Sequence, residues 1–446
     1  MLKDNLVETD INILLSFKTE LKQTLDELPK TLYEFKQRLD VLQSKLNEIS
    51  FENTERNEEA NWWLEALYLQ LQAAITEMTT FAPWVLLSTV PENLNRISQI
   101  IGIPTLQELY NLSESVSEEI SKIDSSDEDA EWLKLFENAI QNGAEHAKER
   151  LAVIEKLAEN CNRFSQMELN FLYDKTKSLL TIGFNVEDHC CDPSFYDLLA
   201  SEARLGIFVG IAQGQLPQES WFALGRLLTN VDGHPILLSW SGSMFEYLMP
   251  LLVMPTYPNT LLDQTDKEAV SLQIEYGKQR KVPWGISECG YNLRDAAQNY
   301  QYRAFGVPGL GLKRGLGEDL VIAPYATMLS LMVNPVKACQ NLEQMASLGF
   351  VGKYGFYEAI DYTQSRLRPG QSHTIVQSYM AHHQGMSLLS LAHLLLNQPM
   401  QKRFEAEPQF QAALLLLQER IPKTSSFYVH TTDIAEVHTT TTEPSV

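Results

Sequence analysis

Apolar residues recur at helical spacing along the first 170 residues, and this period constrains the fold more than any other feature of the sequence. Leu32, Phe35, Leu39, Leu42 and Leu46 fall on one face of a helix, because residues three and four apart are neighbours on a helix surface. Few runs of β-branched residues interrupt the pattern. We therefore predict a helical scaffold or docking layer here, without a chemical motif.

Beyond residue 170, helical stretches alternate with loops rich in glycine, proline and aromatic residues. One such loop is Val282-Pro-Trp-Gly-Ile-Ser-Glu, and the stretch 292–303 is among those that we expect to be helical. Alternation of apolar and polar residues, the pattern of strands, is scarce. Repeated helix–loop–helix units with long loops favour an all-α fold, an (α/α)6 toroid preceded by an N-terminal helical region. Loops held by a rigid scaffold commonly carry function.

A change in composition near residue 170 suggests a domain boundary, because the excess of acidic side chains is larger before it than after it. We expect an N-terminal helical region over residues 1–165, some of whose helices could belong to the barrel. The catalytic barrel is expected over 166–425. The polar end, over 426–446, is predicted to be a linker to a missing C-terminal domain, as in an excised piece of a longer chain.

The net charge of −22 disfavours some classes of partner. Nucleic acids and anionic membranes need a basic surface, so a neutral substrate fits this chain better. No apolar run is long enough to span a membrane, and the first ten residues do not resemble a signal peptide. The five cysteines form no disulfide framework, and Cys190 and Cys191 lack a second pair to complete a zinc site. We predict a reducing compartment and neither a metal nor a cofactor.

Four glutamates lie in stretches that also contain glycine and large aromatic residues: Glu202, Glu246, Glu288 and Glu358. Burial against aromatic rings raises the pKa of a carboxyl group, as a general acid requires. Two such groups across an aromatic cleft are the apparatus of glycoside chemistry. The alternative for each is a helix cap or an ion pair with a nearby arginine, such as Arg294.

Two further motifs have weaker chemical interpretations. The loop Gly309-Leu-Gly-Leu-Lys-Arg-Gly lacks the spacing of a phosphate-binding loop, so Lys313 and Arg314 are expected to pair with carboxylates or sugar hydroxyls. His382 and His383 lie near a predicted helix start. One of them could be packed while the other forms hydrogen bonds in the cleft.

Several stretches, in one order, resemble the middle region of the cyclic β-1,2-glucan synthases. They are Tyr196-Asp-Leu-Leu-Ala-Ser-Glu-Ala-Arg-Leu, Trp240-Ser-Gly-Ser-Met-Phe-Glu-Tyr-Leu-Met-Pro, Val282-Pro-Trp-Gly-Ile-Ser-Glu, Asn299-Tyr-Gln-Tyr-Arg-Ala-Phe-Gly-Val-Pro-Gly-Leu-Gly-Leu-Lys-Arg-Gly, Val321-Ile-Ala-Pro-Tyr-Ala and Tyr354-Gly-Phe-Tyr-Glu-Ala-Ile-Asp. In that family the region is a glycoamylase-like α/α barrel on the cytoplasmic side. It lies between a membrane-embedded glucosyltransferase and a C-terminal phosphorylase-like part, and these domains would be its partners.

The resemblance implies a glycoside-hydrolase-like transglycosylase that closes linear β-1,2-glucan into a ring with retention at the anomeric carbon. It favours Glu202 as nucleophile and Glu288 as acid/base, with Trp284 and Tyr291 as the desolvating wall of Glu288. Because Glu202 is next to Arg204 and near a helix N-terminus, we expect it to stay ionised. The expected substrate-binding residues are Arg204, Trp240, Glu246, Trp284, Tyr300, Tyr302, Arg303, Lys313, Arg314, Tyr357, Glu358 and His383.

Two other functions remain open from the sequence. The first is an endo-β-1,2-glucanase, a hydrolase on the same barrel, which would release linear oligosaccharides. The second is a non-catalytic domain that binds linear or cyclic β-1,2-glucan without exchanging its bonds.

Overall fold

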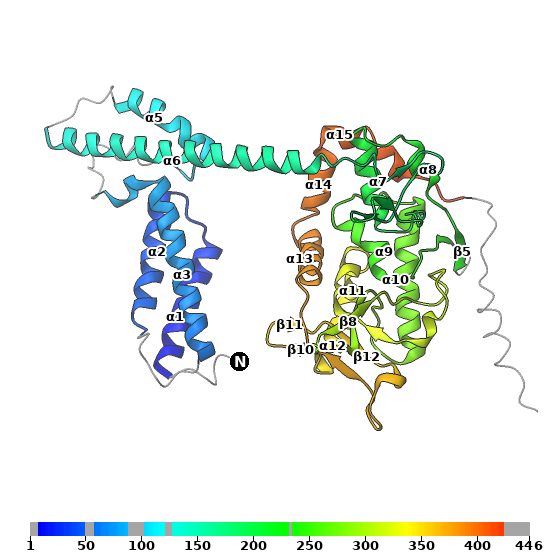
Figure 1. The fold of residues 1–446 in the computed structure, drawn as a ribbon. Coiled ribbons are helices and arrows are strands. Elements are labelled where there is room, and N and C mark those ends of the chain that lie inside the picture. The colour runs from blue at the N-terminus through cyan, green and yellow to red at the C-terminus, as the bar shows by residue number, and fades with distance from the viewer. Residues whose placement is uncertain (1–7, 50–57, 88–101, 121–126, 232–233, 423–446) are drawn as a thin grey trace, which may run out of the picture. The chain divides into compact units, whose positions relative to one another are not determined.

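The computed structural model describes residues 8–49, 58–87, 102–120, 127–231 and 234–422 (Figure 1). The chain divides into two compact units, Met1–Gln166 and Met167–Val446. The predicted linker, residues 426–446, lies outside the described residues.

The described elements of the N-terminal unit are helical. They are α1 (Glu8–Asp26), α2 (Leu32–Asn47), α3 (Glu58–Phe81), the short 3-10 helix η2 (Pro83–Leu86), α5 (Leu106–Ile120) and α6 (Asp127–Ser165). The helical period predicted their core, because Leu39, Leu42 and Leu46 of α2 are buried together with Trp84 and Phe136. The Thr31 hydroxyl caps α2 by accepting the backbone N–H of Glu34, which satisfies one donor of the first turn.

Shorter helices form most of the second unit. They are α7 (Ala203–Ala212), α8 (Glu219–Ala223), α9 (Met244–Leu248), α10 (Leu261–Arg280), α11 (Pro324–Leu329), α12 (Pro335–Ser347), α13 (Ala381–Leu395), α14 (Pro399–Ala406) and α15 (Pro408–Gln411). Short 3-10 turns extend or connect them: η4 (Met249–Leu252), η5 (Leu316–Glu318), η6 (Ser330–Met332), η7 (Gln364–Arg366) and η8 (Leu414–Gln418). Helix α11 contacts α9, α12 and α13, and α10 packs on α9. Phe208, Tyr247 and Leu329 are buried in one continuous core.

Small antiparallel sheets join these helices. The paired strands are β1 (Tyr173–Asp174) with β2 (Leu179–Leu180), β3 (Phe184–Asn185) with β4 (Cys190–Cys191), β5 (Leu228–Val231) with β6 (His234–Leu237), β7 (Cys289–Arg294) with β8 (Tyr300–Arg303), and β10 (Val351–Gly352) with β11 (Gly355–Phe356). A three-stranded sheet has the order β13 (Thr374–Val376), β12 (Ala359–Asp361), β9 (Val321–Ile322). The fold is therefore mainly helical, with strands that the sequence analysis did not expect.

The expected helix over 292–303 is wrong, because this stretch is part of the β7–β8 hairpin. Gly290 pairs with Tyr302 across the hairpin. The side chain of Asp295 accepts the backbone N–H of Asn299, and Gln298 has a left-handed φ of 68°. These features close a turn, and tyrosines at alternate positions of β8 suit a pleated strand.

The glycine-rich loop over 306–311 owes its glycines to close backbone packing. A β-carbon on Gly306 would lie 1.6 Å from the carbonyl oxygen of Ser241, and one on Gly311 would lie 2.6 Å from the nitrogen of Gly242. Backbone bonds join the two loops, including Lys313 N–H to the Trp240 carbonyl at 2.9 Å. The loops therefore lie directly against each other, which places Trp240 beside Lys313.

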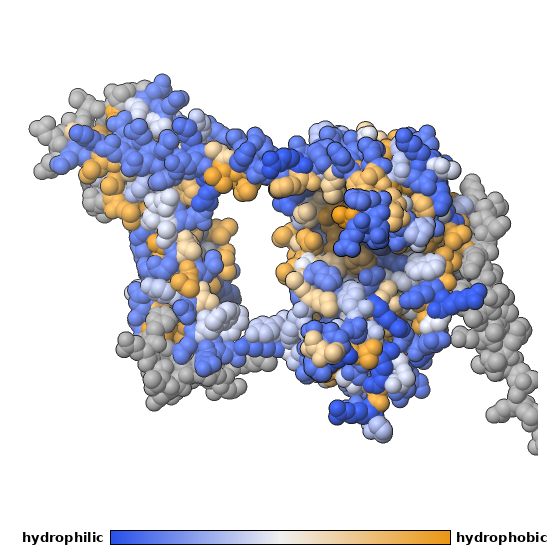
Figure 2. Space-filling model, viewed as in Figure 1, coloured by the Kyte–Doolittle hydropathy of each residue, from blue (hydrophilic) through white to orange (hydrophobic). Residues whose placement is uncertain are grey.

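Apolar surface remains exposed along α13, as Figure 2 shows. Leu388 is 67% exposed and Leu395 is 73% exposed. Within the described part of the chain, every helix is too short or too polar to cross a lipid bilayer.

Candidate active site

A cavity of about 630 Å³ in the second unit brings Glu202, Glu246 and Glu288 together with Trp240. Its volume is that of a pocket for a small organic ligand. Apolar and aromatic side chains complete much of the wall: Ile182, Phe195, Tyr196, Leu198, Leu227, Ala304 and Leu312. Four residues that the sequence singled out thus share one largely apolar cavity.

Glu202 occupies the N-cap position of α7, so the start of this helix places its carboxylate at the cavity. Burial is the largest influence on its pKa and raises it, and the charge of Glu246 adds to the rise. A hydrogen bond from its own backbone N–H, another from Ser201 and the charge of Arg204 lower this pKa. Burial therefore outweighs the helix terminus and Arg204, on which the expectation of an ionised Glu202 rested.

Glu288 precedes β7 and is half-buried. Its pKa is raised from 4.5 to about 7, first by burial and then by the charges of Glu202 and Glu246. The charge of Lys313 acts in the opposite direction and lowers this pKa. At neutral pH the Glu288 carboxyl therefore carries a proton in much of the population. A carboxyl group in this state can act as a general acid.

Glu246 is saturated with hydrogen-bond donors from its own loop. Its carboxylate accepts Ser239 Oγ at 2.9 Å, the Ser241 N–H at 3.0 Å and the Ser243 N–H at 3.0 Å. With Ser243 it also forms a capping box at the start of α9. This side chain fixes the loop that carries Trp240, and its charge acts on the other two glutamates.

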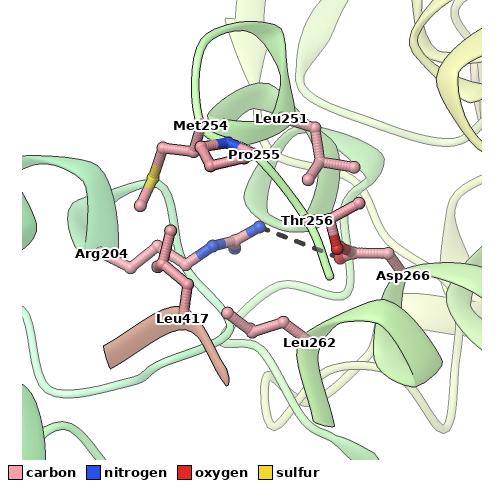
Figure 3. A pocket seen from close by; sticks show the side chains of 8 residues that line it. All are labelled: Arg204, Leu251, Met254, Pro255, Thr256, Leu262, Asp266 and Leu417. Carbon is pink, nitrogen blue, oxygen red and sulfur yellow. Dashed lines mark ion pairs between the residues drawn. The ribbon is translucent and has the colours of Figure 1, made fainter. Parts of the chain in front are cut away.

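Arg204 does not line the active-site cavity, which corrects its expected role in substrate binding. Its side chain is 2% exposed and donates to the backbone carbonyls of Tyr247 at 2.6 Å and Glu246 at 3.1 Å. It instead faces a separate pocket of about 10 Å³, where it lies 3.9 Å from Asp266 (Figure 3). Arg204 therefore connects the start of α7 to α9 through these hydrogen bonds.

Two more predicted residues, Glu358 and His383, lie in a second buried cluster. The Nδ1 atom of His383 is 2.9 Å from Glu358 Oε2, and Glu358 Oε1 accepts the backbone N–H of Gly290 at 3.0 Å. The Nε2 atom of His383 lies 3.3 Å from the hydroxyl of Tyr302. The His383 ring stacks on Tyr325 with centroids 3.7 Å apart.

The remaining predicted residues take varied positions. Trp284, expected beside Glu288, is buried in the core, where its carbonyl accepts the Asn341 amide. Arg303 forms an ion pair with Asp319, and the side chain of Lys313 reaches the carbonyl of Ala304. The other members are Tyr300, whose hydroxyl accepts from Arg294, Tyr357, which lines a cavity of about 150 Å³ beside His383, and Arg314, which is exposed.

Two tyrosines at the site, Tyr196 and Tyr325, were not among the predicted residues. Tyr196 lines the cavity, and its pKa is raised first by burial and then by the charges of Glu202 and Glu288, so it lies near both. The Tyr325 hydroxyl donates to the carbonyl of Glu288 at 2.9 Å. Tyr196 stands in a quoted stretch and could have been found there. Tyr325 also stands in a quoted stretch, Val321-Ile-Ala-Pro-Tyr-Ala, but its contacts with His383 and the Glu288 carbonyl depend on tertiary packing.

Candidate metal ligands do not cluster within the described residues, where no three His, Cys, Asp or Glu side chains are arranged to hold an ion. Cys190 and Cys191 are exposed free thiols on β4, and Cys289 is a buried one. Burial raises the pKa of the Cys289 thiol, which keeps it protonated.

Residues 194–408 match the family model "Glycoamylase: Putative glucoamylase". The chain is 41% identical over 336 residues to the cyclic beta-(1,2)-glucan synthase NdvB of Rhizobium meliloti (strain 1021). This match covers 73% of the chain but 12% of the relative. The chain therefore resembles one segment of a much longer synthase, and the resemblance seen in the sequence is confirmed.

Two solved structures of an endo-beta-1,2-glucanase from Talaromyces funiculosus are also similar. The complex with sophorose is 14% identical, with a TM-score of 0.42, over 88% of this chain and 83% of that chain. A mutant complex with beta-1,2-glucan is 13% identical, with the same TM-score, over 89% of this chain and 83% of that chain.

Proposed function

We propose that this chain is an anomer-retaining transglycosylase that closes linear β-1,2-glucan into a ring through a covalent glycosyl-enzyme. The observation that carries the proposal is the presence of Glu202 and Glu288 in one cavity, with a pKa of about 7 at Glu288. The similarity to a segment of a cyclic beta-(1,2)-glucan synthase supplies the substrate class.

The reaction needs two proton-balanced steps. In the first, Glu202 bonds to C1 of a glucose unit while Glu288 gives its proton to the departing glycosidic oxygen. In the second, the ionised Glu288 takes a proton from the 2-hydroxyl at the far end of the same chain. That oxygen attacks C1, the bond to Glu202 breaks, and both carboxyl groups return to their initial states.

The environment of the two carboxyls supports this assignment of roles. Burial raises the pKa of Glu202, but hydrogen bonds from its own N–H and from Ser201 counteract this and favour the ionised form. The pKa of Glu288 is raised mainly by burial and then by the negative charges of Glu202 and Glu246, and it is lowered by Lys313. Because like charges disfavour a doubly ionised pair, the first ionisation falls on Glu202 and the proton stays on Glu288.

The apolar wall supports transfer in preference to hydrolysis. Phe195, Leu198 and Leu312 line the cavity around the glutamates, and an enzyme that transfers a glycosyl group must keep water from the intermediate. Trp240 lines the same cavity and is 61% exposed, so its indole face is available to stack on a sugar ring. We assign sugar binding to Trp240, Lys313 and the exposed surfaces of Tyr302 and Tyr357.

The wider organisation belongs to the same proposal. We assign the catalytic domain to residues 166–425 and its helices to an (α/α)6 toroid. We also propose that the domain works within a longer synthase, on the cytoplasmic side, beside a membrane-embedded glucosyltransferase and a phosphorylase-like domain. The 12% coverage of the relative supports a place within a larger chain.

An endo-β-1,2-glucanase is the second candidate, because the same pair of carboxyls could transfer the glycosyl group to water. Incubation with linear β-1,2-glucan, followed by mass spectrometry, separates the two reactions. A ring weighs one water less than the open chain of the same length, whereas hydrolysis gives shorter open chains. Glucan that is bound and recovered unchanged after long incubation would contradict both and leave a binding domain.

A further inference from the structure

The cluster around His383 forms a directed chain of hydrogen bonds. Glu358 is 3% exposed and His383 is 1% exposed, so both lie beneath the surface. Tyr302 is 41% exposed and its hydroxyl touches His383 Nε2. The chain thus runs from a buried carboxylate, through an imidazole, to a phenol that reaches solvent.

The chemistry of each group decides which atom donates and which accepts in this series of hydrogen bonds. A carboxylate only accepts hydrogen bonds, so the Nδ1 atom of His383, 2.9 Å from Glu358, carries the proton. In the neutral ring, Nε2 is then an acceptor, and the hydroxyl of Tyr302 must donate to it. The only proton of that hydroxyl points inward, and its oxygen offers lone pairs to a ligand.

Tyr302 lies on β8, opposite the start of β7 that follows Glu288. Tyr302 pairs across the hairpin with Gly290, two residues after Glu288. The pKa of Tyr302 is raised by burial and next by the charge of Glu288. Ala304, two residues further along the chain, lines the active-site cavity.

Tyr325 holds the imidazole in place between these groups. Its ring lies parallel to His383, at 10° between planes. Its hydroxyl is 2.8 Å from Ser287 Oγ and donates to the Glu288 carbonyl. The His383 ring is therefore fixed by the same backbone segment that carries Glu288.

We propose that Glu358 and His383 are positioning residues that turn the hydroxyl of Tyr302 inward, so that its oxygen accepts a hydrogen bond from a sugar hydroxyl beside Glu288. Tyr302 is then a specificity-determining residue, which favours a ligand group that donates over one that only accepts. This inference rests on the proposed function, since it takes the ligand to be a glucan.

Glu358→Gln should reverse the direction of the hydrogen bonds from residue 358 through His383 to Tyr302, because the two side chains have almost the same size. The Gly290 N–H must still meet an acceptor, so the amide oxygen turns to it and the NH₂ group faces His383 Nδ1. Nδ1 then becomes the acceptor and Nε2 carries the proton. Nitrogen-15 NMR of histidine-labelled protein, with His383→Asn to assign the signal, measures this directly. We expect Nδ1–H in the wild type and Nε2–H in Glu358→Gln; the same tautomer in both proteins would overturn the proposal.

Kinetics on linear β-1,2-glucan test the consequence. Loss of one hydrogen bond to substrate in Tyr302→Phe is expected to lower kcat/KM about 10- to 100-fold. Glu358→Gln should lose a similar factor, and the double variant should lose no more than Tyr302→Phe alone. Tyr110→Phe, at 42% exposure on α5, is the matched control and should be unchanged. Losses that multiply in the double variant would assign Glu358 a separate role and contradict the inference.

Two measurements keep this test independent of folding and of the reaction itself. Tyr302→Phe removes one hydroxyl group from a side chain that is 41% exposed, so an unchanged kcat/KM in this variant overturns the inference even if Glu358→Gln does not fold. If the wild type binds glucan without exchanging bonds, the proposed reaction fails. Equilibrium binding of glucan to Tyr302→Phe, with the NMR experiment, then still decides the inference.

Discussion

The charge of Glu202 is, after burial, the largest influence that raises the pKa of Glu288 to about 7. The two carboxyl groups line one cavity, so the negative charge of Glu202 disfavours ionisation of Glu288. Burial and the charge of Glu202 therefore favour the protonated form of Glu288, which suits it to the role of the acid.

Glu202→Gln and Glu288→Gln are each expected to abolish turnover of linear β-1,2-glucan while leaving the thermal unfolding midpoint close to that of the wild type. Glu202→Gln should also lower the pKa of Glu288, because it removes a neighbouring negative charge. Carbon-13 NMR titration of glutamate-labelled protein measures that pKa. The control is Glu275→Gln, an exposed residue of α10, which should keep full activity. Full activity in either site variant would remove that glutamate from the mechanism.

The pH dependence of kcat/KM should have a basic limb near pH 7. Glu288 must be protonated to act as the acid, and its pKa of about 7 means that the proton is lost as the pH rises through that value. Initial rates between pH 5 and pH 9 test this. If Glu288 were instead the nucleophile, activity would rise through the same range, and the two roles would have to be exchanged.

Lys313→Met should move the basic limb to higher pH. The ammonium of Lys313 lowers the pKa of Glu288, so its removal leaves the carboxyl protonated over a wider range. Lys337→Met, on the exposed face of α12, is the control and should leave the limb in place. A limb that does not move in Lys313→Met would contradict the electrostatic link.

Asp266→Asn should remove a pH-dependent loss of stability. Neither carboxylate oxygen of Asp266 has a hydrogen-bond partner among the described residues, and burial raises its pKa from 3.8 to about 7. The folded state then binds the proton more tightly than the unfolded state, so stability falls as the pH rises from about 4 to about 7. Denaturant unfolding at pH 4 and pH 8 should show a smaller fall in Asp266→Asn, by on the order of a few kcal/mol.

The exposed Asp188 provides the control for that experiment, since Asp188→Asn should leave the wild-type slope unchanged. An equal fall in Asp266→Asn and in the wild type would show that the Arg204 charge fully compensates the buried carboxylate.

Gly306→Ala should destabilise the protein by about 2 kcal/mol or more, as for overpacking in a rigid site. The added β-carbon would lie 1.6 Å from the Ser241 carbonyl oxygen, so the loop with Trp240 must move and activity should fall too. Gly385→Ala, in α13 with open space around it, should be neutral or stabilising, because alanine favours helix. Calorimetry and glucan turnover measure both variants, and equal midpoints for the two would contradict the close packing.

The helical character and the four candidate glutamates could be predicted from local patterns, whereas the choice of Glu202 and Glu288 came from the family resemblance. The helical spacing of apolar residues identifies the buried helix faces. Glycine and aromatic residues near a glutamate indicate a carboxylate that is not simply solvated. The β7–β8 hairpin was missed because its turn depends on a left-handed residue, Gln298, which no spacing of apolar residues reveals.

The direction of each side chain could not be predicted from the sequence. Arg204 is two residues from Glu202 but points into a separate pocket, and Trp284 is near Glu288 in sequence but packs in the core. Tyr325 and His383 are far apart in the chain and meet only through the contact of α11 with α13. Tertiary packing decides these positions, so only the structure separates ligand-facing residues from supporting ones.

The close backbone packing of two loops, Ser241–Gly242 and Gly306–Gly311, matters for engineering. Since the two backbones touch with no room for a single methyl group, neither segment can be lengthened or exchanged by itself. Libraries that alter this wall of the site should therefore vary both segments together, as one cassette.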